Sequence, residues 1–463
     1  MSSPPSEHRL TPIERRASGA LAAVFGLRML GLFLIMPVIA IYGRSYPDYT
    51  PVLVGLAIGA YGLTQALLQI PLGMLSDRIG RRPVIIGGLL VFAVGSLVAA
   101  AADTLTGVVI GRALQGTGAI AAAILALAAD VTRDSQRPKV MALIGMCIGL
   151  SFAIALVLGP LLGQYIGLSG LFVFTAVSAV AGILVLLVAV PDVKARTAKG
   201  DVLPLRGELK SLLRHGQLAR LNAGVFVLHC ILTAFFVVVP VQLVAGGLAA
   251  EQHAWLYLPA LLASFALMIP MLIRAEKKRQ QPFYFRVAIA LLIAAVVVIG
   301  FGPSHWLYLV AAIVVFFTGF NFLEANLPSS LTRFAPAGRK GSASGIYATA
   351  QFMGAFVGGI SGGLMLQYFG LMGIGIFCVV LLLCWFLITA GMQPPPQWKN
   401  ISFTLRTLDH QQVEQLAAAL AEVNGVEEVR IVPAEQTAYL KVHKTDYNEQ
   451  AIKAQLAPYQ NNH

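Results

Sequence analysis

The chain has 463 residues, of which 57% are hydrophobic and only 12% are charged, and its mean hydropathy is +0.77. A single globular core cannot bury so much apolar surface, so we expect lipid to cover part of it. The formal net charge of +12 would suggest nucleic-acid binding in a soluble protein. In a chain of this composition, the membrane topology must be considered before any such partner.

Twelve apolar stretches are each long enough to cross a bilayer as a helix, which requires about 20 residues. The polar residues Met1 to Arg16 have no apolar core of their own, so we expect no cleavable signal peptide. The pattern predicts an all-α membrane protein with both termini on one side. The predicted spans are residues 17–43, 51–75, 84–102, 105–129, 139–165, 170–190, 219–244, 253–273, 283–301, 305–330, 342–367 and 371–391.

The basic residues indicate which side is cytoplasmic. Of the 33 Lys and Arg residues, 24 fall in the N-terminal tail and in alternate loops, whereas the opposite loops hold only Arg44. Because cytoplasmic loops carry the excess of positive charge, we expect both termini to be cytoplasmic. Membrane topology thus accounts for the excess of basic residues, and we expect no nucleic-acid partner.

An internal repeat divides the membrane part into two halves. A shift of 199 residues places GPLLG at 159–163 on GGISG at 358–362. Transporters are often built from such duplicated bundles. The predicted domains are a six-helix half at 1–190, a cytoplasmic linker at 191–218, a second six-helix half at 219–391, a proline-rich tether at 392–397 and a soluble domain at 398–463.

The loop between the second and third spans reads GMLSDRIGRR at residues 73–82. Its glycines permit a tight turn, Asp77 offers an acceptor, and the arginines place positive charge on the inner side. The segment matches every defined position of the G-x-x-x-D-R-x-G-R-R loop and resembles the major facilitator superfamily. The resemblance covers about 390 residues and implies a twelve-helix bundle of two six-helix halves.

The resemblance also implies a conformational latch at this loop. Asp77 would bind the free amides at the start of the helix near Gly341, and Arg81 would link to Asp130. Alternatively, the two carboxylates only neutralise a basic loop. The residues assigned to the latch are Gly73, Asp77, Arg78, Gly80, Arg81, Arg82, Asp130 and Gly341.

The fourth span contains GRALQG at residues 111–116, which resembles the R-x-x-x-G segment of the same superfamily. That resemblance places Arg112, with Gln115 one turn later, toward a central cavity, because an arginine in lipid is costly. Alternatively, Arg112 extends outward to the membrane surface, since it lies only a few residues inside the span.

The fifth span contains GPLLG at residues 159–163, which resembles the antiporter motif of twelve-helix drug/proton exchangers. In that group, glycines and a proline equivalent to Gly159, Pro160 and Gly163 bend the helix and permit close packing against the other half. Gln164 replaces the final glycine of the motif, so the match is incomplete.

Polar side chains inside the spans are candidates for substrate and ion chemistry, because they are costly in lipid. Glu324 is the only acidic residue well inside a span, and we predict that it carries the coupled proton. Alternatively, Glu324 is a structural carboxylate paired with Arg28 or lying near the inner interface. His229 either relays a proton or packs as a hydrogen-bonded residue. The set assigned to the central cavity and coupling is Arg28, Arg112, Gln115, His229, Asn321 and Glu324.

The segment after the tether has a soluble composition. Its pattern predicts a βαββα order: a strand at 401–405, a helix capped by Asp409 and ended by Gly425, strands at 426–432 and 438–443, and a second helix opened by Asp446. This order resembles the ferredoxin-like heavy-metal-associated domains. The predicted fold is therefore an all-α membrane bundle with a small α+β ferredoxin-like domain at its C-terminus.

The soluble domain contains no cysteine, so we expect no soft-metal site and no cofactor. A regulatory role is one interpretation, in which the domain docks to the cytoplasmic face or to an unknown protein. The alternative is a passive appendage that only stabilises the chain.

The function that these features predict is proton-coupled secondary export of small amphipathic molecules or drugs by alternating access. Two alternatives remain: uptake of a sugar or metabolite by the same fold, and a non-transporting membrane sensor with a regulatory tail. An enzyme is disfavoured because no nucleophile, base and orienting residue converge. The resemblance also implies a monomer in the bacterial inner membrane, with protons and a small molecule as its ligands.

Overall fold

The computed structural model describes residues 10–133, 136–191, 209–443 and 446–460. Within them, ten helical segments are long and apolar enough to cross a membrane. Two of these segments have 51 and 52 residues. A straight helix of that length would extend about 75 Å, more than twice the bilayer core of about 30 Å, so each must turn back.

A glycine with left-handed backbone marks the turn in each long segment. In α7 (Arg137–Ala189) it is Gly167, with φ 62°, and in α14 (Lys340–Ile388) it is Gly370, with φ 66°. Glycine adopts this conformation without the clash that a Cβ atom would cause. The ten segments therefore provide the twelve crossings predicted, with the gaps close to residues 165–170 and 367–371.

The N-terminal half contains two interrupted crossings that the sequence pattern did not predict. α1 and α2 are separated near Ile35, where the ring of Pro37 interrupts the regular helical hydrogen bonds. The fourth crossing, predicted as one helix over 105–129, breaks at Gly118–Ile120. The helices of this half are α1 (Pro12–Leu34), α2 (Met36–Tyr42), α3 (Pro51–Ile79), α4 (Arg81–Ala100), α5 (Leu105–Thr117), α6 (Ala121–Asp130) and α7.

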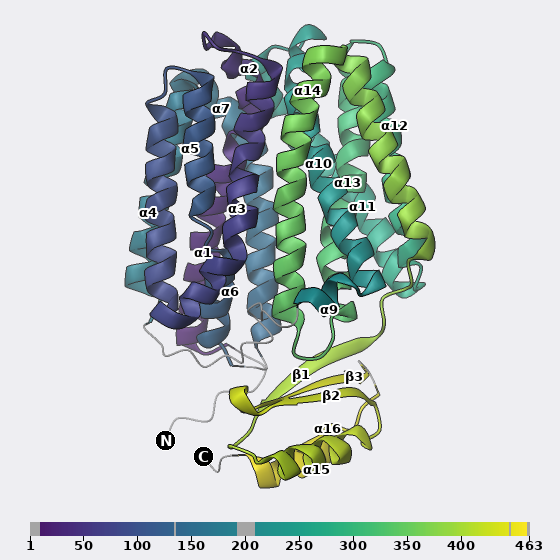
Figure 1. Ribbon diagram of the computed structural model, residues 1–463. Coiled ribbons are helices and arrows are strands. Elements are labelled where there is room, and N and C mark those ends of the chain that lie inside the picture. Colours follow the sequence, from purple (N-terminus) through teal and green to yellow (C-terminus); the bar gives the residue numbers. More distant parts are fainter. Residues whose placement is uncertain (1–9, 134–135, 192–208, 444–445, 461–463) are drawn as a thin grey trace.

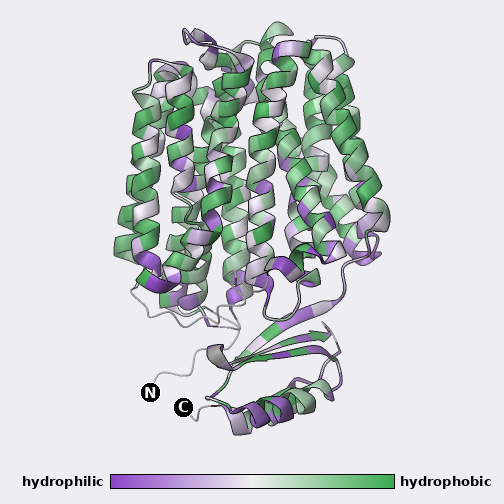
Figure 2. Ribbon diagram, in the orientation of Figure 1, coloured by the Kyte–Doolittle hydropathy of each residue, from purple (hydrophilic) through white to green (hydrophobic). Residues whose placement is uncertain are grey.

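The C-terminal half lies beside the N-terminal half, and apolar residues cover the length of both bundles (Figures 1 and 2). Most of the predicted linker, residues 192–208, lies outside the described residues. The short helix α9 (Leu209–Leu213) follows it. The spanning helices of this half are α10 (Gly216–Ala245), α11 (His253–Lys277), α12 (Gln281–Phe301), α13 (Trp306–Phe334) and α14.

The two halves meet along a glycine seam, formed by Gly55 and Gly59 of α3 and Gly359 and Gly363 of α14. A Cβ atom on Gly55 would overlap the carbonyl oxygen of Gly359, and one on Gly59 would lie 2.9 Å from the Phe356 oxygen. Small residues at this spacing let two helix backbones approach closely in lipid. The seam lies at the end of the bundle remote from the C-terminal domain (Figure 1), called the distal end below.

The C-terminal domain has the βαββα order predicted from its sequence: β1 (Trp398–Thr404), α15 (His410–Ala421), β2 (Val426–Val432), β3 (Thr437–His443) and α16 (Glu449–Leu456). The antiparallel sheet has the order β1-β3-β2. Asp409 caps α15 as predicted, accepting a 2.8 Å bond from the Gln412 amide. The prediction for α16 was wrong: Asn448, not Asp446, is its cap, because the Asn448 side chain reaches the Ala451 amide.

The two faces of this sheet have different partners. Helices α15 and α16 cover one face, and the other is turned toward the bundle (Figure 1). Residues two apart on a strand point to the same face, and Arg430 of β2 lies opposite Tyr439 of β3. Both contact Gly338 in the loop between α13 and α14: Arg430 Nη1 donates to its carbonyl at 3.4 Å, and a Cβ there would lie 2.7 Å from the Tyr439 ring.

Candidate functional site

Three polar side chains from three helices meet in the C-terminal half. Gln351 of α14 places its Nε2 2.8 Å from Nε2 of His229 on α10 and 3.5 Å from Oε1 of Glu324 on α13. His229 Nε2 is also 3.8 Å from Glu324 Oε2. We call these three residues the polar cluster. The structure thus brings together two residues that the sequence indicated separately, and adds Gln351.

The hydrogen bonds of the polar cluster define its protonation chemistry. His229 Nδ1 lies 3.1 Å from the Val225 carbonyl oxygen, which can only accept, so Nδ1 carries the proton of the neutral ring. Nε2 is then free to accept from Gln351. In the described part of the chain, Glu324 Oε2 and the hydroxyl of the nearby Tyr347 have no hydrogen-bond partner. Within the cluster, Oε2 of Glu324 is therefore the acceptor that these hydrogen bonds leave unused.

Glu324 is not sealed inside the protein, since its side chain is 38% exposed. The exposed residues that follow on the same helix include no large apolar side chain: they are Ala325, Pro328, Ser329 and Thr332. A face of this kind is suited to water rather than to lipid. Glu324 thus lies between its half-buried hydrogen-bond partner Gln351 and a path of small and polar residues toward the C-terminal domain.

An aromatic cluster adjoins these polar groups and joins the two halves. Phe320 lies one turn before Glu324, with its ring centroid 6.1 Å from that of His229. Phe152, from α7 of the N-terminal half, inserts among rings of α10 and α13, with centroids 6.5 Å from Phe236 and 6.0 Å from Phe317. Phe236 and Phe317 are fully buried, so these rings fill the contact between the two halves.

Arg28 is buried on the other side of the molecule. Its Nη2 donates to Gln65 Oε1 at 2.8 Å and to the Gly118 carbonyl at 3.0 Å. Gln65 in turn donates to Gln69. The alternative that Arg28 pairs with Glu324 is therefore wrong, because the neighbours of Arg28 come from α3 and from the break after α5.

Arg112 is likewise enclosed, with only 1% of its surface exposed. It donates to the Ala57 carbonyl at 3.0 Å and to Gln115 Oε1 at 2.9 Å, and Gln115 donates to Ser96 at 2.7 Å. The alternative in which Arg112 extends outward is wrong, since these contacts hold it inside the half. Asn321 lies apart from the polar cluster and donates to Ser264 of α11 at 3.1 Å.

The loop at residues 73–82 forms an ionic network within the N-terminal half. Arg81 lies 2.7 Å from Asp77 and 3.3 Å from Asp130, and also donates to Ser76 at 2.9 Å. Gly80, with φ 98°, makes the turn between α3 and α4 that brings these groups together. The link expected between Arg81 and Asp130 is therefore present.

Sequence and geometry here agree with one family. A model of the Major Facilitator Superfamily matches residues 21–359. The chain belongs to this superfamily. It is 40% identical to the inner membrane transport protein YajR of Escherichia coli over 97% of the chain and 99% of that protein. It is also 31% identical to an uncharacterized transporter of Buchnera aphidicola over 75% of the chain and 89% of that protein.

More distant matches extend the comparison. The multidrug resistance protein MdtH of Aeromonas hydrophila is 25% identical over 75% of the chain and 87% of that protein. A solved bacterial homologue of the human lysosomal transporter Spinster, in an inward-facing and occupied conformation, covers 82% of the chain and 97% of its own length, with a TM-score of 0.68 and 13% identity. These similarities establish a multi-pass superfamily transporter fold, and the similarity to YajR implies the inner membrane.

Other residues of the superfamily loop make local contacts. Among the described residues, no hydrogen bond joins Asp77 to the start of α14, where Gly341 is the second residue and is buried. Arg82 donates to the carbonyls of Leu186 and Val190 at the end of α7. Gly73 is buried in α3, and Arg78 is exposed.

The glycines of the antiporter-like segment contact their own half. A Cβ on Gly159 would lie 2.5 Å from the Leu34 carbonyl oxygen, and one on Gly163 would lie 3.4 Å from Tyr42. The expectation that they pack against the other half was therefore wrong for both. Pro160 is inside α7 between them. The close contact between halves instead uses the glycine seam of α3 and α14.

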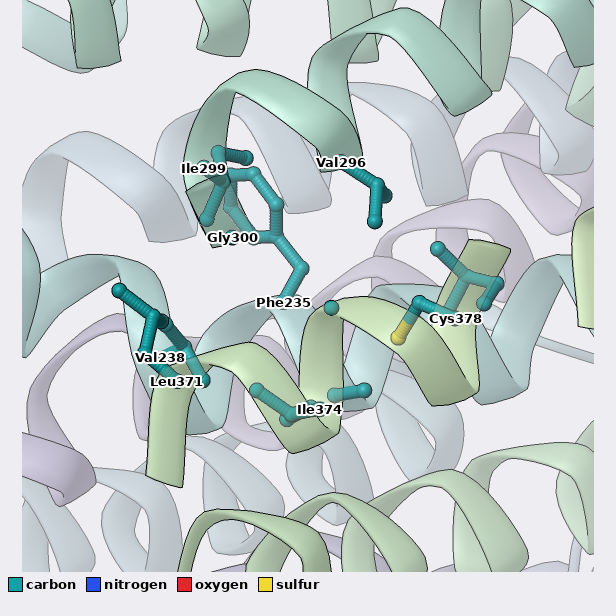
Figure 3. Close-up of a pocket in the computed structure, with 11 residues that line it drawn as sticks. Phe235, Val238, Val296, Ile299, Gly300, Leu371, Ile374 and Cys378 are labelled. Atoms are coloured by element: carbon teal, nitrogen blue, oxygen red, sulfur yellow. The ribbon is translucent and has the colours of Figure 1, made fainter. Parts of the chain in front are cut away.

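A cavity inside the C-terminal half does not provide the substrate site. It has a volume of about 30 Å³ and lies between α10, α12 and α14, with Phe235, Ile299 and Cys378 on its walls (Figure 3). Sites for small organic ligands occupy about 300 Å³ or more, and a few placed polar groups orient the ligand. This small apolar cavity meets neither condition.

Proposed function

We propose that the chain is a proton-coupled secondary transporter that exports small amphipathic molecules by alternating access. The observation that carries the proposal is the polar cluster beside the aromatic cluster. Glu324 offers a carboxylate that binds either a proton or a cationic group. Phe152, Phe317 and Phe320 pack together here and would offer an apolar surface to the rest of the molecule when the halves separate. The relative named a multidrug resistance protein supports this assignment.

The coupling follows from the cost of burying a charge. When the two halves close around Glu324, its negative charge must be neutralised, because an unpaired carboxylate in a dry interior is strongly disfavoured. A proton or a bound cation meets this requirement, but both cannot bind the same carboxylate at once. Proton entry and substrate exit are thereby exchanged. Gln351 donates to both His229 and Glu324 and would hold the two side chains in position between these events.

The proposed orientation places both termini and the C-terminal domain in the cytoplasm, as the distribution of basic residues predicts. One chain supplies both halves of the site: Phe152 comes from the N-terminal half, and Glu324 from the C-terminal half. We therefore propose that the transporter acts as a monomer.

Proteoliposomes that contain a pH-sensitive dye test the coupling. On addition of ethidium or tetraphenylphosphonium, we expect proton movement with the wild type and a loss of at least tenfold with Glu324→Gln. Glu276→Gln is a matched control, because Glu276 lies at the helix end and pairs with Arg333 at 2.9 Å. Proton-coupled flux that is equal in wild type and Glu324→Gln would contradict the role of Glu324.

The same measurement separates the alternatives. Proton movement in the same direction as a sugar or metabolite would indicate uptake. No flux of any tested compound, combined with saturable binding, would favour a sensor. If Glu324→Gln transports with the same rate and the same proton coupling as the wild type, the transport function stands. Only the assignment of Glu324 as its site is then contradicted.

The superfamily loop is proposed as a latch that holds the cytoplasmic end closed. Arg81 holds the Asp77 carboxylate beside the turn at Gly80, and this positions Asp77 for the role. When the halves close at that end, Asp77 would meet the amides at Gly341, a contact worth up to about 2 kcal/mol when partly buried. Asp77→Asn should shift distances between spin labels on the cytoplasmic ends of α7 and α14 toward the open state. An unchanged distance distribution would refute the latch.

The C-terminal domain is proposed to dock on the bundle as a regulatory element. The Ala337 amide donates to Glu428 Oε2 at 3.2 Å, and Arg430 binds the Gly338 carbonyl. A polar cavity of about 320 Å³ separates the domain from the N-terminal half, with Asp130 on one wall and Thr404 on the other. The domain therefore contacts the end of the C-terminal half and faces the end of the N-terminal half across this cavity.

A further inference from the structure

The N-terminal half holds two buried arginines that no described acidic side chain accompanies. The guanidinium carbons of Arg28 and Arg112 lie 5.8 and 5.3 Å from the centroid of the same ring, Tyr61. All hydrogen bonds of these arginines in the described chain go to neutral amide or carbonyl oxygens. Two positive charges in a dry interior are strongly disfavoured unless a negative charge balances them.

Three donors in this region have no hydrogen-bond partner among the described residues. Arg28 is 0% exposed, and only its Nη2 is hydrogen-bonded, so its Nε and Nη1 are buried donors without a partner. The hydroxyl of Tyr61 is a third. Buried donors almost always have an acceptor, and those of a guanidinium bind an anion most strongly.

The backbone next to Arg28 is interrupted in a way that also favours an anion. Gly118, whose carbonyl Arg28 binds, lies in the break between α5 and α6. α6 begins at Ala121, and no side chain caps its N-terminus, where Ile120 is the cap residue. Free amides at a helix N-terminus carry a partial positive charge, and interrupted helices form ligand sites in transporters.

We propose that Arg28, Tyr61 and the α5–α6 break form a binding site for a small, singly charged anion. Tyr61 also determines when the anion can enter. Its ring packs against Phe352 of α14, with centroids 6.1 Å apart, at the contact between the halves. Separation of α3 from α14 uncovers Tyr61 and the charge behind it, so the site opens and closes with the transport cycle.

The anion has two possible sources with the same chemistry: an inorganic halide, or the carboxylate of an organic molecule. Thermal unfolding of the purified full-length protein in detergent distinguishes them, with sodium chloride or sodium benzoate added to isethionate buffer at constant ionic strength. We expect a saturable rise in melting temperature of roughly 3 °C at saturation. A rise with chloride indicates a halide, and a rise with benzoate alone indicates a carboxylate.

Two substitutions locate the effect. Arg28→Gln should remove the dependence on the anion, whereas Arg286→Gln, which changes an arginine near the end of the other half, should retain it. Tyr61→Phe removes only the hydroxyl and should weaken the apparent affinity several-fold, which keeps the test decisive if Arg28→Gln does not fold. No rise with either anion, or an unchanged apparent affinity in both Arg28→Gln and Tyr61→Phe, would overturn the proposal. The measurement uses no pH gradient, so its result is independent of proton coupling.

Discussion

Gln351 connects the two titratable groups of the polar cluster, and its role was not evident from the sequence. Glu324 and His229 stand out because charged and titratable groups are rare in apolar helices. Nothing in the sequence distinguishes Gln351 from other polar residues of its helix. Its contacts depend on how α10, α13 and α14 pack. The sequence therefore predicted Glu324 and His229 as candidate residues, but it did not predict that Gln351 joins them.

Replacing Gln351 tests this connection. Gln351→Met keeps the volume but removes both hydrogen bonds, whose net worth is about 1 kcal/mol each. We expect proton-driven flux to fall about tenfold, corresponding to 1.4 kcal/mol in the barrier, and its pH profile to shift. Leu383→Met, at an exposed site on the same helix, is the control. Equal flux and pH profiles in both variants would exclude Gln351 from the coupling.

At the scale of helices, some interruptions were predictable and others were not. Hydropathy predicted the gaps between crossings near Gly167 and Gly370, because an apolar segment of about 50 residues is too long for one crossing. The break at Gly118 left no such mark, since glycine is tolerated inside a helix and the flanking residues stay apolar. Only the tertiary structure shows that Arg28 binds the carbonyl at this break.

The glycine seam between α3 and α14 predicts how a substitution would change the separation of the two halves at the distal end. Gly359→Leu would place a side chain against the α3 backbone at Gly55, where even a Cβ has no room. We therefore expect the distal end to open and transport to fall sharply, while the protein remains inserted. Spin labels on the distal ends of α3 and α14 measure the change. Gly87→Leu, where nothing lies within 4 Å of the added Cβ, is the control. A distal distance in Gly359→Leu that matches the control would contradict the seam as a gate.

At the scale of the whole molecule, hydropathy, charge and one motif predicted the twelve crossings and the superfamily. They do so because the bilayer dictates the length and composition of each crossing. The order of elements in the C-terminal domain was also predictable, since its strands alternate and its helix has a capping residue, Asp409. The contact of that domain with the bundle depends on Glu428, Arg430 and Tyr439, which resemble ordinary surface residues of a sheet.

Reversing two charges on that surface tests whether the domain docks. Glu428→Lys with Arg430→Glu removes the acceptor for the Ala337 amide and the donor to the Gly338 carbonyl, each worth on the order of 1 kcal/mol. Both residues lie on the sheet face turned toward the bundle, so the domain core, built around Leu416 and Leu440, should stay intact. The domain should then detach without unfolding.

Limited proteolysis of the full-length protein measures this detachment. Release of the domain exposes the tether at 392–397, so we expect cleavage there to become several-fold faster in the double variant. Glu427→Lys changes the charge of an exposed neighbour on the same strand and should leave the rate unchanged. Circular dichroism of the released fragment shows whether the domain is still folded. If the double variant and Glu427→Lys are cleaved at the same rate, the contacts at Ala337 and Gly338 do not hold the domain on the bundle.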